Sequence, residues 1–138
     1  MIQTRRPTRL YQGYIFDLDG TIYLGEALLP GARRAIKALR RTGCRVAFVS
    51  NNPTKTRQAY AAKLTRLGLP TPVQDVINSS YVMVNYLLER APGAHLFPIS
   101  EQPLIDELRA AGFAISGTRL CPESPARAGR PQRSTSVG

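Results

Sequence analysis

The chain has 138 residues, 43% of them hydrophobic, which suits one domain with a buried core but is short for an enzyme with a complete second domain. It has no apolar run long enough to cross a membrane or to make a secretory signal. It has only two cysteines, too few for a disulfide framework. We therefore expect a protein of the reducing cytoplasm. The net charge of +10 comes mostly from the two ends, and the arginines of residues 117–138 have no aromatic neighbours to stack bases, so we expect at most a weak, salt-dependent association with nucleic acid.

The first half of the chain is predicted to form two strands joined by a helix. Residues 12–17 are mostly apolar and predict a strand that is buried on both faces. Pro30 begins an amphipathic helix with apolar residues at helical spacing, and Gly43 ends it. Residues 44–49 predict a second strand, which ends at Ser50. This spacing is typical of a right-handed crossover between two parallel strands.

Shorter elements are predicted in the second half. We expect a helix over about 54–67 that stops at Gly68, a strand over 75–78, a helix over 80–90, a strand over 95–99, a helix over 103–111 and a strand over 113–115. From residue 117 the sequence has three prolines, no periodicity and little to bury, which predicts a disordered tail. The alternation of strands and helices predicts an α/β fold with a parallel sheet.

Two carboxylates, Asp17 and Asp19, follow the first predicted strand one residue apart. Alternate side chains of a strand share a face, so both can leave the sheet in one direction while Leu18 points elsewhere. The two groups would repel each other unless a cation or a proton lay between them. The arrangement suits phosphate chemistry in which Asp17 attacks, Asp19 manages the proton, and Mg²⁺ held between them offsets the charge.

Polar residues that could hold a phosphate follow the same two strands. Gly20 lets the backbone turn sharply close to the anion, and Thr21 comes next. Ser50, Asn51 and Asn52 end the second strand, just before a helix whose N-terminus favours negative charge. Because ligands bind beyond the carboxyl ends of parallel strands, we expect both groups to meet at one site.

Other interpretations of these residues remain open. The acidic motif could be a calcium loop or an Asp-Gly hairpin turn, but Leu28 stands where a calcium loop would need a glutamate. Lys55 is interpreted as an exposed lysine of the first helical turn and His95 as a structural residue of a strand. Tyr23 and Tyr60 are interpreted as packing residues.

The motifs resemble those of the haloacid dehalogenase superfamily of phosphatases, in its NagD-like, p-nitrophenyl phosphatase branch. The resemblance covers about residues 11–116 and rests on residues 14–25, 29–32, 48–56, 64–68, 76–80 and 107–112. It implies a Rossmann-like core with an inserted α/β cap. By this resemblance the chain divides into a basic arm (1–10), the N-terminal part of the core (11–72), a partial cap (73–116) and the tail (117–138).

The resemblance also implies roles for the residues of the predicted site. Asp17 would be the nucleophile and Asp19 the general acid and base. The Asp17 carboxylate and the Asp19 carbonyl would bind Mg²⁺, while Ser50 and Asn51 would bind the phosphate of a small phosphorylated metabolite.

Two family features are missing from the sequence: a phosphate-neutralising lysine and a Gly-Asp motif that completes the magnesium site, both located after the cap. No Gly-Asp pair occurs after Gly20 and no lysine after Lys63. We therefore expect an incomplete core whose exposed apolar edge favours homo-oligomers, in a truncated or frameshifted phosphatase with reduced or no activity. The alternative is a non-catalytic fragment that binds phosphate or pairs with another chain.

Overall fold

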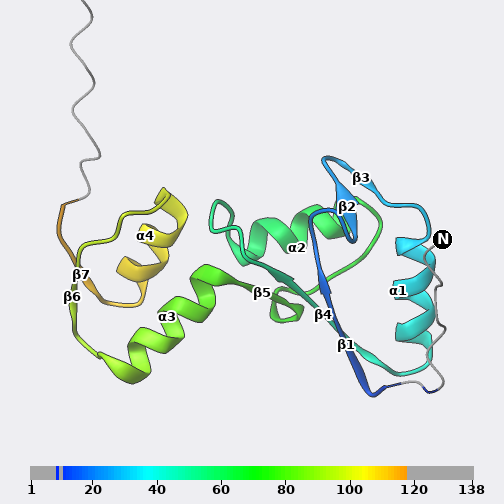
Figure 1. Ribbon diagram of the computed structural model, residues 1–138, viewed down its shortest axis with the longest axis horizontal. Helices are drawn as coiled ribbons and strands as arrows, with labels where there is room; N and C mark the ends of the chain where they lie inside the picture. The colour runs from blue at the N-terminus through cyan, green and yellow to red at the C-terminus, as the bar shows by residue number, and fades with distance from the viewer. Residues whose placement is uncertain (1–8, 10, 118–138) are drawn as a thin grey trace, which may run out of the picture.

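The centre of the fold is a three-stranded parallel sheet in the order β1-β4-β5 (Figure 1). The computed structural model describes residue 9 and residues 11–117. The strands are β1 (Gly13–Asp17), β4 (Arg45–Ser50) and β5 (Val76–Asn78). The predicted α/β fold with a parallel sheet is therefore confirmed. Because β5 pairs with β4, residues 76–78 belong to this sheet, although the sequence grouped them with the cap.

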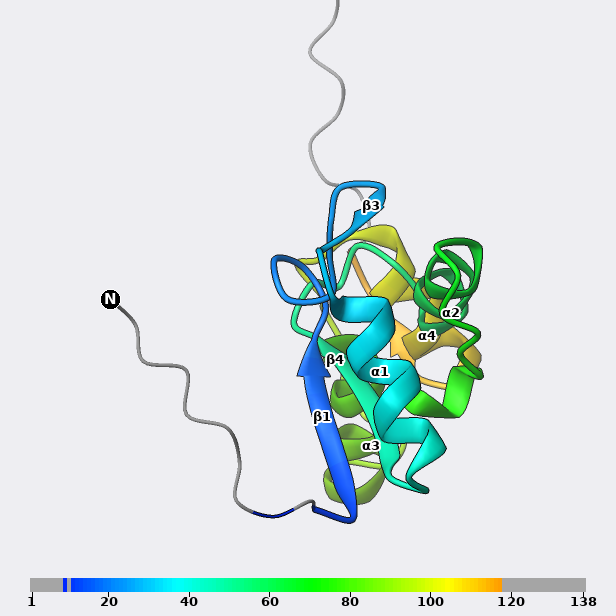
Figure 2. The same ribbon diagram turned by 90° about the vertical axis from the view of Figure 1, so that its right-hand side faces the viewer.

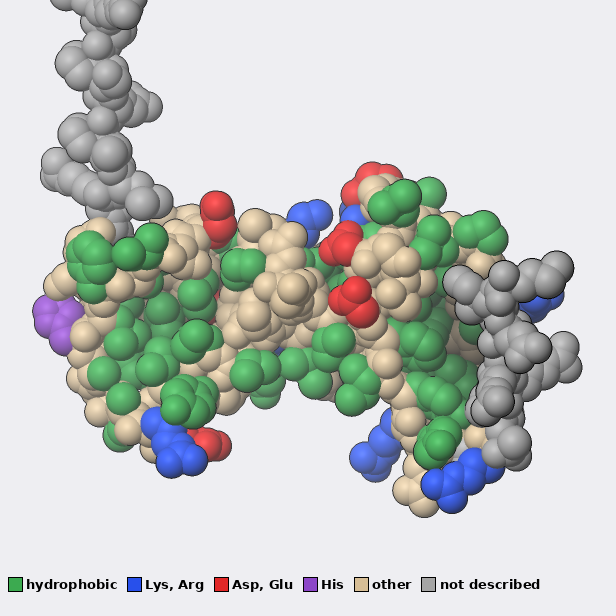
Figure 3. Space-filling view, in the orientation of Figure 1, with side chains coloured by type: hydrophobic (Ala, Val, Ile, Leu, Met, Phe, Trp, Pro, Cys, Tyr) green, Lys and Arg blue, Asp and Glu red, His purple; other side chains and the backbone are tan. Residues whose placement is uncertain are grey.

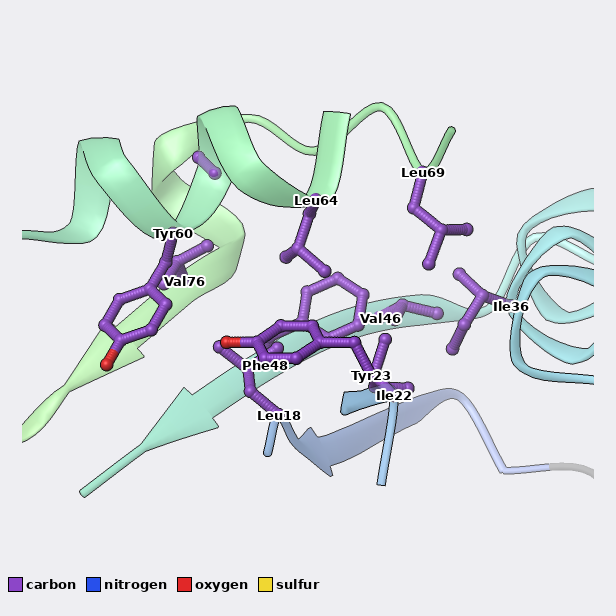
Figure 4. Close-up of a cluster of buried hydrophobic side chains, with 11 residues drawn as sticks. Leu18, Ile22, Tyr23, Ile36, Val46, Phe48, Tyr60, Leu64, Leu69 and Val76 are labelled. Atoms are coloured by element: carbon purple, nitrogen blue, oxygen red, sulfur yellow. The ribbon is translucent and has the colours of Figure 1, made fainter. Parts of the chain in front are cut away.

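Two helices cover one face of the sheet. They are α1 (Ala32–Arg41) and α2 (Arg57–Arg66), and Figure 4 shows their side chains, such as Ile36 and Leu64, directed onto β4. Phe48, in the middle of β4, is fully buried between the sheet and these helices. The core cluster comprises Leu18, Ile22, Tyr23, Ile36, Val46, Phe48, Tyr60, Ala61, Leu64, Leu69 and Val76. Burial of this apolar surface is the main stabilising term of the fold.

The opposite face of the sheet is open, which corrects the prediction that the first strand is buried on both faces. Ile15 is 70% exposed, and its neighbour on β4, Ala47, is only half-buried. Figure 2 shows β1 at the margin of the sheet with α1 to one side of it. An apolar strand sequence predicts burial only if elements cover both faces, and within residues 11–117 helices α1 and α2 both pack on the other face.

A short hairpin that the sequence analysis did not predict follows the acidic motif. Strands β2 (Tyr23–Leu24) and β3 (Ala27–Leu28) pair antiparallel around Gly25, which has a positive φ of 57°. The turn is held to α2, because Glu26 forms ion pairs with Lys63 at 3.3 Å and with Arg66 at 2.6 Å. Two turn residues between apolar pairs would have been the sequence signal for this hairpin.

Residues 79–117 form a second group of elements beside the sheet, on the left of Figure 1. A 3₁₀ turn (Val73–Asp75) leads into β5, and helices α3 (Ser79–Arg90) and α4 (Gln102–Ala110) then pack together. Strands β6 (His95–Leu96) and β7 (Ala114–Ile115) pair in parallel. The strand expected over 95–99 is shorter because Pro98 has no N–H to donate. His95 Nε2 lies 2.6 Å from Ser116 Oγ, which fits a structural role.

The predicted arm and tail lie almost entirely outside the described residues, which exclude 1–8, 10 and 118–138. Over the part of the chain that the structure describes, no helix combines the length and the apolarity needed to span a bilayer.

Replacing Gly68 with alanine should lower the free energy of unfolding by about 2 kcal/mol. Gly68 ends α2 with a φ of 88°, and an added Cβ would lie 2.7 Å from Nη2 of Arg33. That nitrogen donates to the Leu67 carbonyl at 2.8 Å, so the substitution adds backbone strain and displaces a hydrogen-bond donor.

Gly93→Ala is the matched control, because Gly93 also has a positive φ but open space around its Cβ position. Urea denaturation should show a loss of about 1 kcal/mol for this control, from backbone strain alone. Equal losses in the two variants would show that the Arg33 contact contributes nothing.

Candidate active site

The carboxyl ends of the three parallel strands meet at one cavity of about 740 Å³. Asp17 ends β1, Ser50 ends β4 and Asn78 ends β5. The strand register places Asp17 beside Val49 and Ser50 beside Asn78. The cavity lining consists of Asp17, Val49, Ser50, Asn51, Ile77, Asn78, Ser79, Val82, Met83 and Tyr86. The structure therefore brings together the acidic strand end and the Ser-Asn strand end, which the sequence predicted to share one site.

The acidic motif makes a tight turn directly after β1. Leu18 is fully buried whereas Asp17 and Asp19 are exposed, as strand alternation predicts. Gly20 has a φ of 77°, and its N–H donates to the Tyr23 carbonyl at 2.8 Å. The Thr21 N–H donates to the Leu18 carbonyl at 3.3 Å. Asp19, Gly20 and Thr21 thus lie in the turn next to the cavity without lining it.

The hydroxyl of Ser50 is already hydrogen-bonded within its own loop. Ser50 Oγ donates to Tyr60 Oη at 3.1 Å and accepts from the Asn52 N–H at 3.2 Å. Tyr60 Oη in turn donates to the Asn52 carbonyl at 3.1 Å. Tyr60 is buried, as predicted for a packing residue, but it also fixes the predicted phosphate loop. No local sequence signal could have revealed this link, since Tyr60 comes from the facing helix.

Asn51 and Asn52 differ in what they contribute to the loop. The Asn51 side chain is exposed at the cavity, whereas Asn52 Oδ1 accepts from the Thr54 N–H at 2.9 Å and lies outside the lining. Asn52 therefore shapes the turn. Lys55 is exposed, as predicted, and does not line the cavity either.

Two residues at the end of β5 belong to the site although the sequence analysis did not select them. Asn78 is buried; its Oδ1 accepts from the Tyr81 N–H at 2.9 Å, and its Nδ2 donates to the Lys55 carbonyl at 3.0 Å. Ser79 Oγ donates to the Asn51 carbonyl at 3.1 Å. Both side chains tie the loop after β4 to the start of α3. The sequence did contain a signal for these two site residues, because polar residues follow this strand as they follow β1 and β4.

Two buried residues, Lys63 and Tyr23, lie beside the acidic turn. The Lys63 ammonium lies 3.8 Å from the centre of the Tyr23 ring and is itself buried. Burial raises the pKa of the Tyr23 phenol above its usual value, and the nearby Asp19 carboxylate raises it further. Hydrogen bonds from Arg66 and Lys63 lower the pKa of the Glu26 carboxyl. The phenol of Tyr23 therefore stays protonated beside Asp19.

The site itself is poor in charged groups. Among the residues that the structure describes, Asp17 is the only charged one in the cavity lining. Among the described residues no group of three histidine, cysteine, aspartate or glutamate side chains is arranged to hold a metal ion. Asp17 and Asp19 are therefore the carboxylates available to a cation at this edge of the sheet, and Mg²⁺ commonly needs only one or two, with waters and phosphate completing its shell.

Comparison with known proteins identifies the family. The sequence profile of the haloacid dehalogenase-like hydrolases matches residues 14–114, most of the chain. The chain belongs to this family. The match includes the acidic turn, the Ser-Asn-Asn loop and the end of β5, and it confirms the resemblance drawn from the sequence motifs.

Relatives and solved structures that the chain resembles include proteins named as phosphatases. It is 41% identical to the sugar phosphatase AraL of Bacillus subtilis over 100 residues, which are 72% of this chain and 37% of that protein. The 4-nitrophenylphosphatase of Thermotoga maritima superposes with a TM-score of 0.71 at 30% identity, over 75% of this chain and 40% of the other. A glycerol phosphate phosphatase of Mycobacterium tuberculosis, crystallised with magnesium, superposes with a TM-score of 0.66 at 30% identity. This match covers 75% of this chain and 31% of the other. The chain thus spans well under half the length of the relatives that it matches.

Proposed function

We propose that this chain carries the nucleophile-bearing half of a phosphomonoester hydrolase site, with Asp17 as nucleophile and Asp19 as general acid and base. The observation that supports this most directly is the shared cavity of Asp17, Ser50 and Asn51 at the carboxyl ends of adjacent parallel strands. Family membership adds the reaction class, and the names of the relatives indicate small phosphorylated metabolites as substrates. The cytoplasm is the compartment where such substrates would be met.

The proposed reaction has two displacements at phosphorus. In the first, an oxygen of Asp17 attacks the phosphorus, the bond to the ester oxygen breaks, and Asp19 gives its proton to the leaving alkoxide. In the second, Asp19 takes a proton from water, which attacks the aspartyl-phosphate and releases phosphate and the free Asp17 carboxylate. Ser50, Asn51 and Asn52 shape the phosphate-binding loop, and Gly20 and Thr21 form the facing turn.

Mg²⁺ is the proposed cofactor, held by the Asp17 carboxylate and the backbone carbonyl of Asp19. The donor set suits it, because both are hard oxygen ligands and the solved relative from Mycobacterium tuberculosis contains magnesium. When bound, the ion would neutralise charge on the phosphate. This matters here because no lysine or arginine of the described part of the chain lines the cavity.

Catalysis by the 138-residue chain alone should be weak or absent, which is the second candidate function: phosphate binding without turnover. Within the described residues, the cavity lining has no basic side chain and no group of three metal-binding side chains is found, and both observations favour this second function. A truncated or frameshifted origin would account for both features. Losing electrostatic stabilisation of this kind costs a factor of about 10² to 10³ in rate for each donor removed.

The test is the response of the 138-residue chain to inorganic phosphate with and without Mg²⁺. We expect Mg²⁺-dependent NMR shifts at the Asn51 and Ser50 amides, and Asp17→Asn should abolish the Mg²⁺-dependent part. In EDTA the same variant should bind phosphate equally or more tightly, since it removes a repelling charge. Asp106→Asn, an exposed aspartate of α4, is the control and should behave like the wild type.

Two further outcomes separate the candidates. A phosphoryl adduct trapped on Asp17 by acid quench after incubation with p-nitrophenyl phosphate supports the hydrolase. Phosphate binding without an adduct supports the binding fragment. Shifts that persist unchanged in Asp17→Asn, or that map to another surface, would remove Asp17 from its proposed role.

A further inference from the structure

The group of elements formed by residues 79–117 continues directly from the sheet. Strand β5 ends at Asn78 and α3 begins at Ser79, so no loop separates the two elements. Figure 3, compared with Figure 1, shows this group as a lobe on the left that a narrower middle joins to the sheet and its helices. The side chains of Asn78 and Ser79 attach the start of α3 to the loop after β4. A helix attached at one point can tilt about it, so the direction of α3 depends on a second contact.

Arg57 is attached to the sheet side of this junction. It is the first residue of α2, after the N-cap Thr56, and it is half-buried. Its Nε donates to the Val76 carbonyl at 2.7 Å, and its Nη2 donates to the Val73 carbonyl at 2.9 Å. A guanidinium holds its donors in a planar fork, so two acceptors fix its orientation as well as its place. Arg57 thus joins α2 to the turn that leads into β5.

The same guanidinium covers the ring of Tyr81, in the first turn of α3. Its central carbon lies 3.9 Å from the centre of the ring, which is within the range of an attractive cation–π contact. Arg57 also acts on α4: burial raises the pKa of the Glu107 carboxyl, and the charge of Arg57 opposes that shift. Arg57, Tyr81 and Glu107 line one crevice of about 640 Å³ between α2, α3 and α4. One side chain of α2 therefore contacts the sheet and the second group of elements at once.

We infer that Arg57 is a positioning residue, which fixes the direction of α3 relative to the sheet and thereby the width of the proposed substrate cavity. Three side chains of α3 line that cavity: Val82, Met83 and Tyr86. At about 3.6 residues per turn, the centre of their common face lies opposite Tyr81 on the helix. A tilt of α3 about its junction with β5 would therefore move this wall relative to Asp17.

The phosphate loop and the α3 wall of the cavity are held by different contacts. Tyr60 holds the loop after β4 through Ser50 and Asn52, and Arg57 takes no part in those hydrogen bonds. Removing Arg57 should therefore spare the binding of phosphate itself and weaken ligands that also reach the wall. This consequence for ligands rests on the proposed function, whereas the direction of α3 does not.

Amide residual dipolar couplings of the 138-residue chain measure the direction of α3 relative to α2 and β4. We expect one alignment tensor to fit all three elements in the wild type. In Arg57→Ala the α3 couplings should require another orientation or a smaller amplitude. Tyr81→Ala should have the same effect while the two carbonyl hydrogen bonds of Arg57 remain, whereas Tyr81→Phe keeps the ring and should behave like the wild type. Gln58→Ala, at the exposed next residue of α2, is the control and should also behave like the wild type.

Ligand affinity tests the consequence for the cavity. The probes are inorganic phosphate and phenylphosphonate, which carries a ring in the place of the leaving group and has no ester bond to hydrolyse. Each is titrated in the presence of Mg²⁺ while the Asn51 amide is followed by NMR. Arg57→Ala should weaken phenylphosphonate about threefold to tenfold and inorganic phosphate less than about twofold, because only part of the molecules then has the wall in place.

Two results would overturn the inference. One is a set of α3 couplings that still fits the tensor of the sheet in both Arg57→Ala and Tyr81→Ala. The other is equal weakening of the two ligands by Arg57→Ala, which would place the effect of Arg57 on the phosphate loop. If neither ligand binds to the wild type, the proposed function fails, and the dipolar couplings alone decide whether Arg57 positions α3.

Discussion

Replacing Phe48 with alanine should lower the free energy of unfolding by about 3–5 kcal/mol. The Phe48 ring is fully buried; it lies 6.5 Å from the Phe16 ring and 5.9 Å from the Arg40 guanidinium. Its strand, β4, is paired on both sides, so the backbone cannot move inward to fill the space that the ring leaves. The loss therefore includes both the transfer of the ring to water and the cost of a cavity. This loss of stability is measured by urea denaturation, monitored by circular dichroism.

Phe97→Ala is the matched control, because the same atoms are removed from a ring that is 65% exposed. We expect a loss below about 1 kcal/mol. Similar losses in the two variants would contradict the placement of the main core between β4 and helices α1 and α2.

Asn78→Ala should cost about 2–4 kcal/mol and loosen the loop after β4. The side chain caps α3 through the Tyr81 N–H and donates to the Lys55 carbonyl, and it is almost fully buried. Alanine leaves both of these part-buried backbone groups without their partner. Urea denaturation gives the stability, and hydrogen exchange of residues 51–55 reports the loop.

Asn78→Ser separates the two contributions. Serine can cap the helix, but its side chain is too short to reach the Lys55 carbonyl as the asparagine amide does. We therefore expect Asn78→Ser to recover about 1 kcal/mol of the free energy of unfolding that Asn78→Ala loses. The amides of the loop should exchange as fast as in the alanine variant. Asn85→Ala, which removes an exposed amide within α3, should change little. A loop that exchanges at the wild-type rate in Asn78→Ala would show that the Lys55 contact does not hold it.

Local patterns were enough to predict most elements. The helical spacing before Gly43 and Gly68 marked α1 and α2 to within a few residues, because amphipathic periodicity and glycine stops are local properties. The strands that end at Asp17, Ser50 and Asn78 were also predicted, and comparison confirmed the family to which these motifs pointed. The roles of the individual site residues remain predictions.

Apart from the hairpin of β2 and β3 and the polar end of β5, which had local signals, the features that were missed depend on what packs against a residue from elsewhere in the chain. The apolar run of β1 predicts a strand but does not show which of its faces a helix will cover, so the exposure of Ile15 was missed. Tyr60 looked like a core residue, and only the fold places its hydroxyl against Ser50. The pairing of Val76–Asn78 with β4 was not foreseen either, because it is a long-range contact.

By itself the sequence determined most of the elements, the family, and the ends of the strands at which Asp17 and Ser50 stand, because periodicity, turn residues and strand ends are encoded by neighbours in the chain. Only the tertiary structure decided that Tyr60 and Asn78 hold the loop at the cavity where these ends meet, and that Ile15 is exposed. Those features depend on contacts between residues far apart in the chain, whose geometry is set when the sheet and its helices pack together.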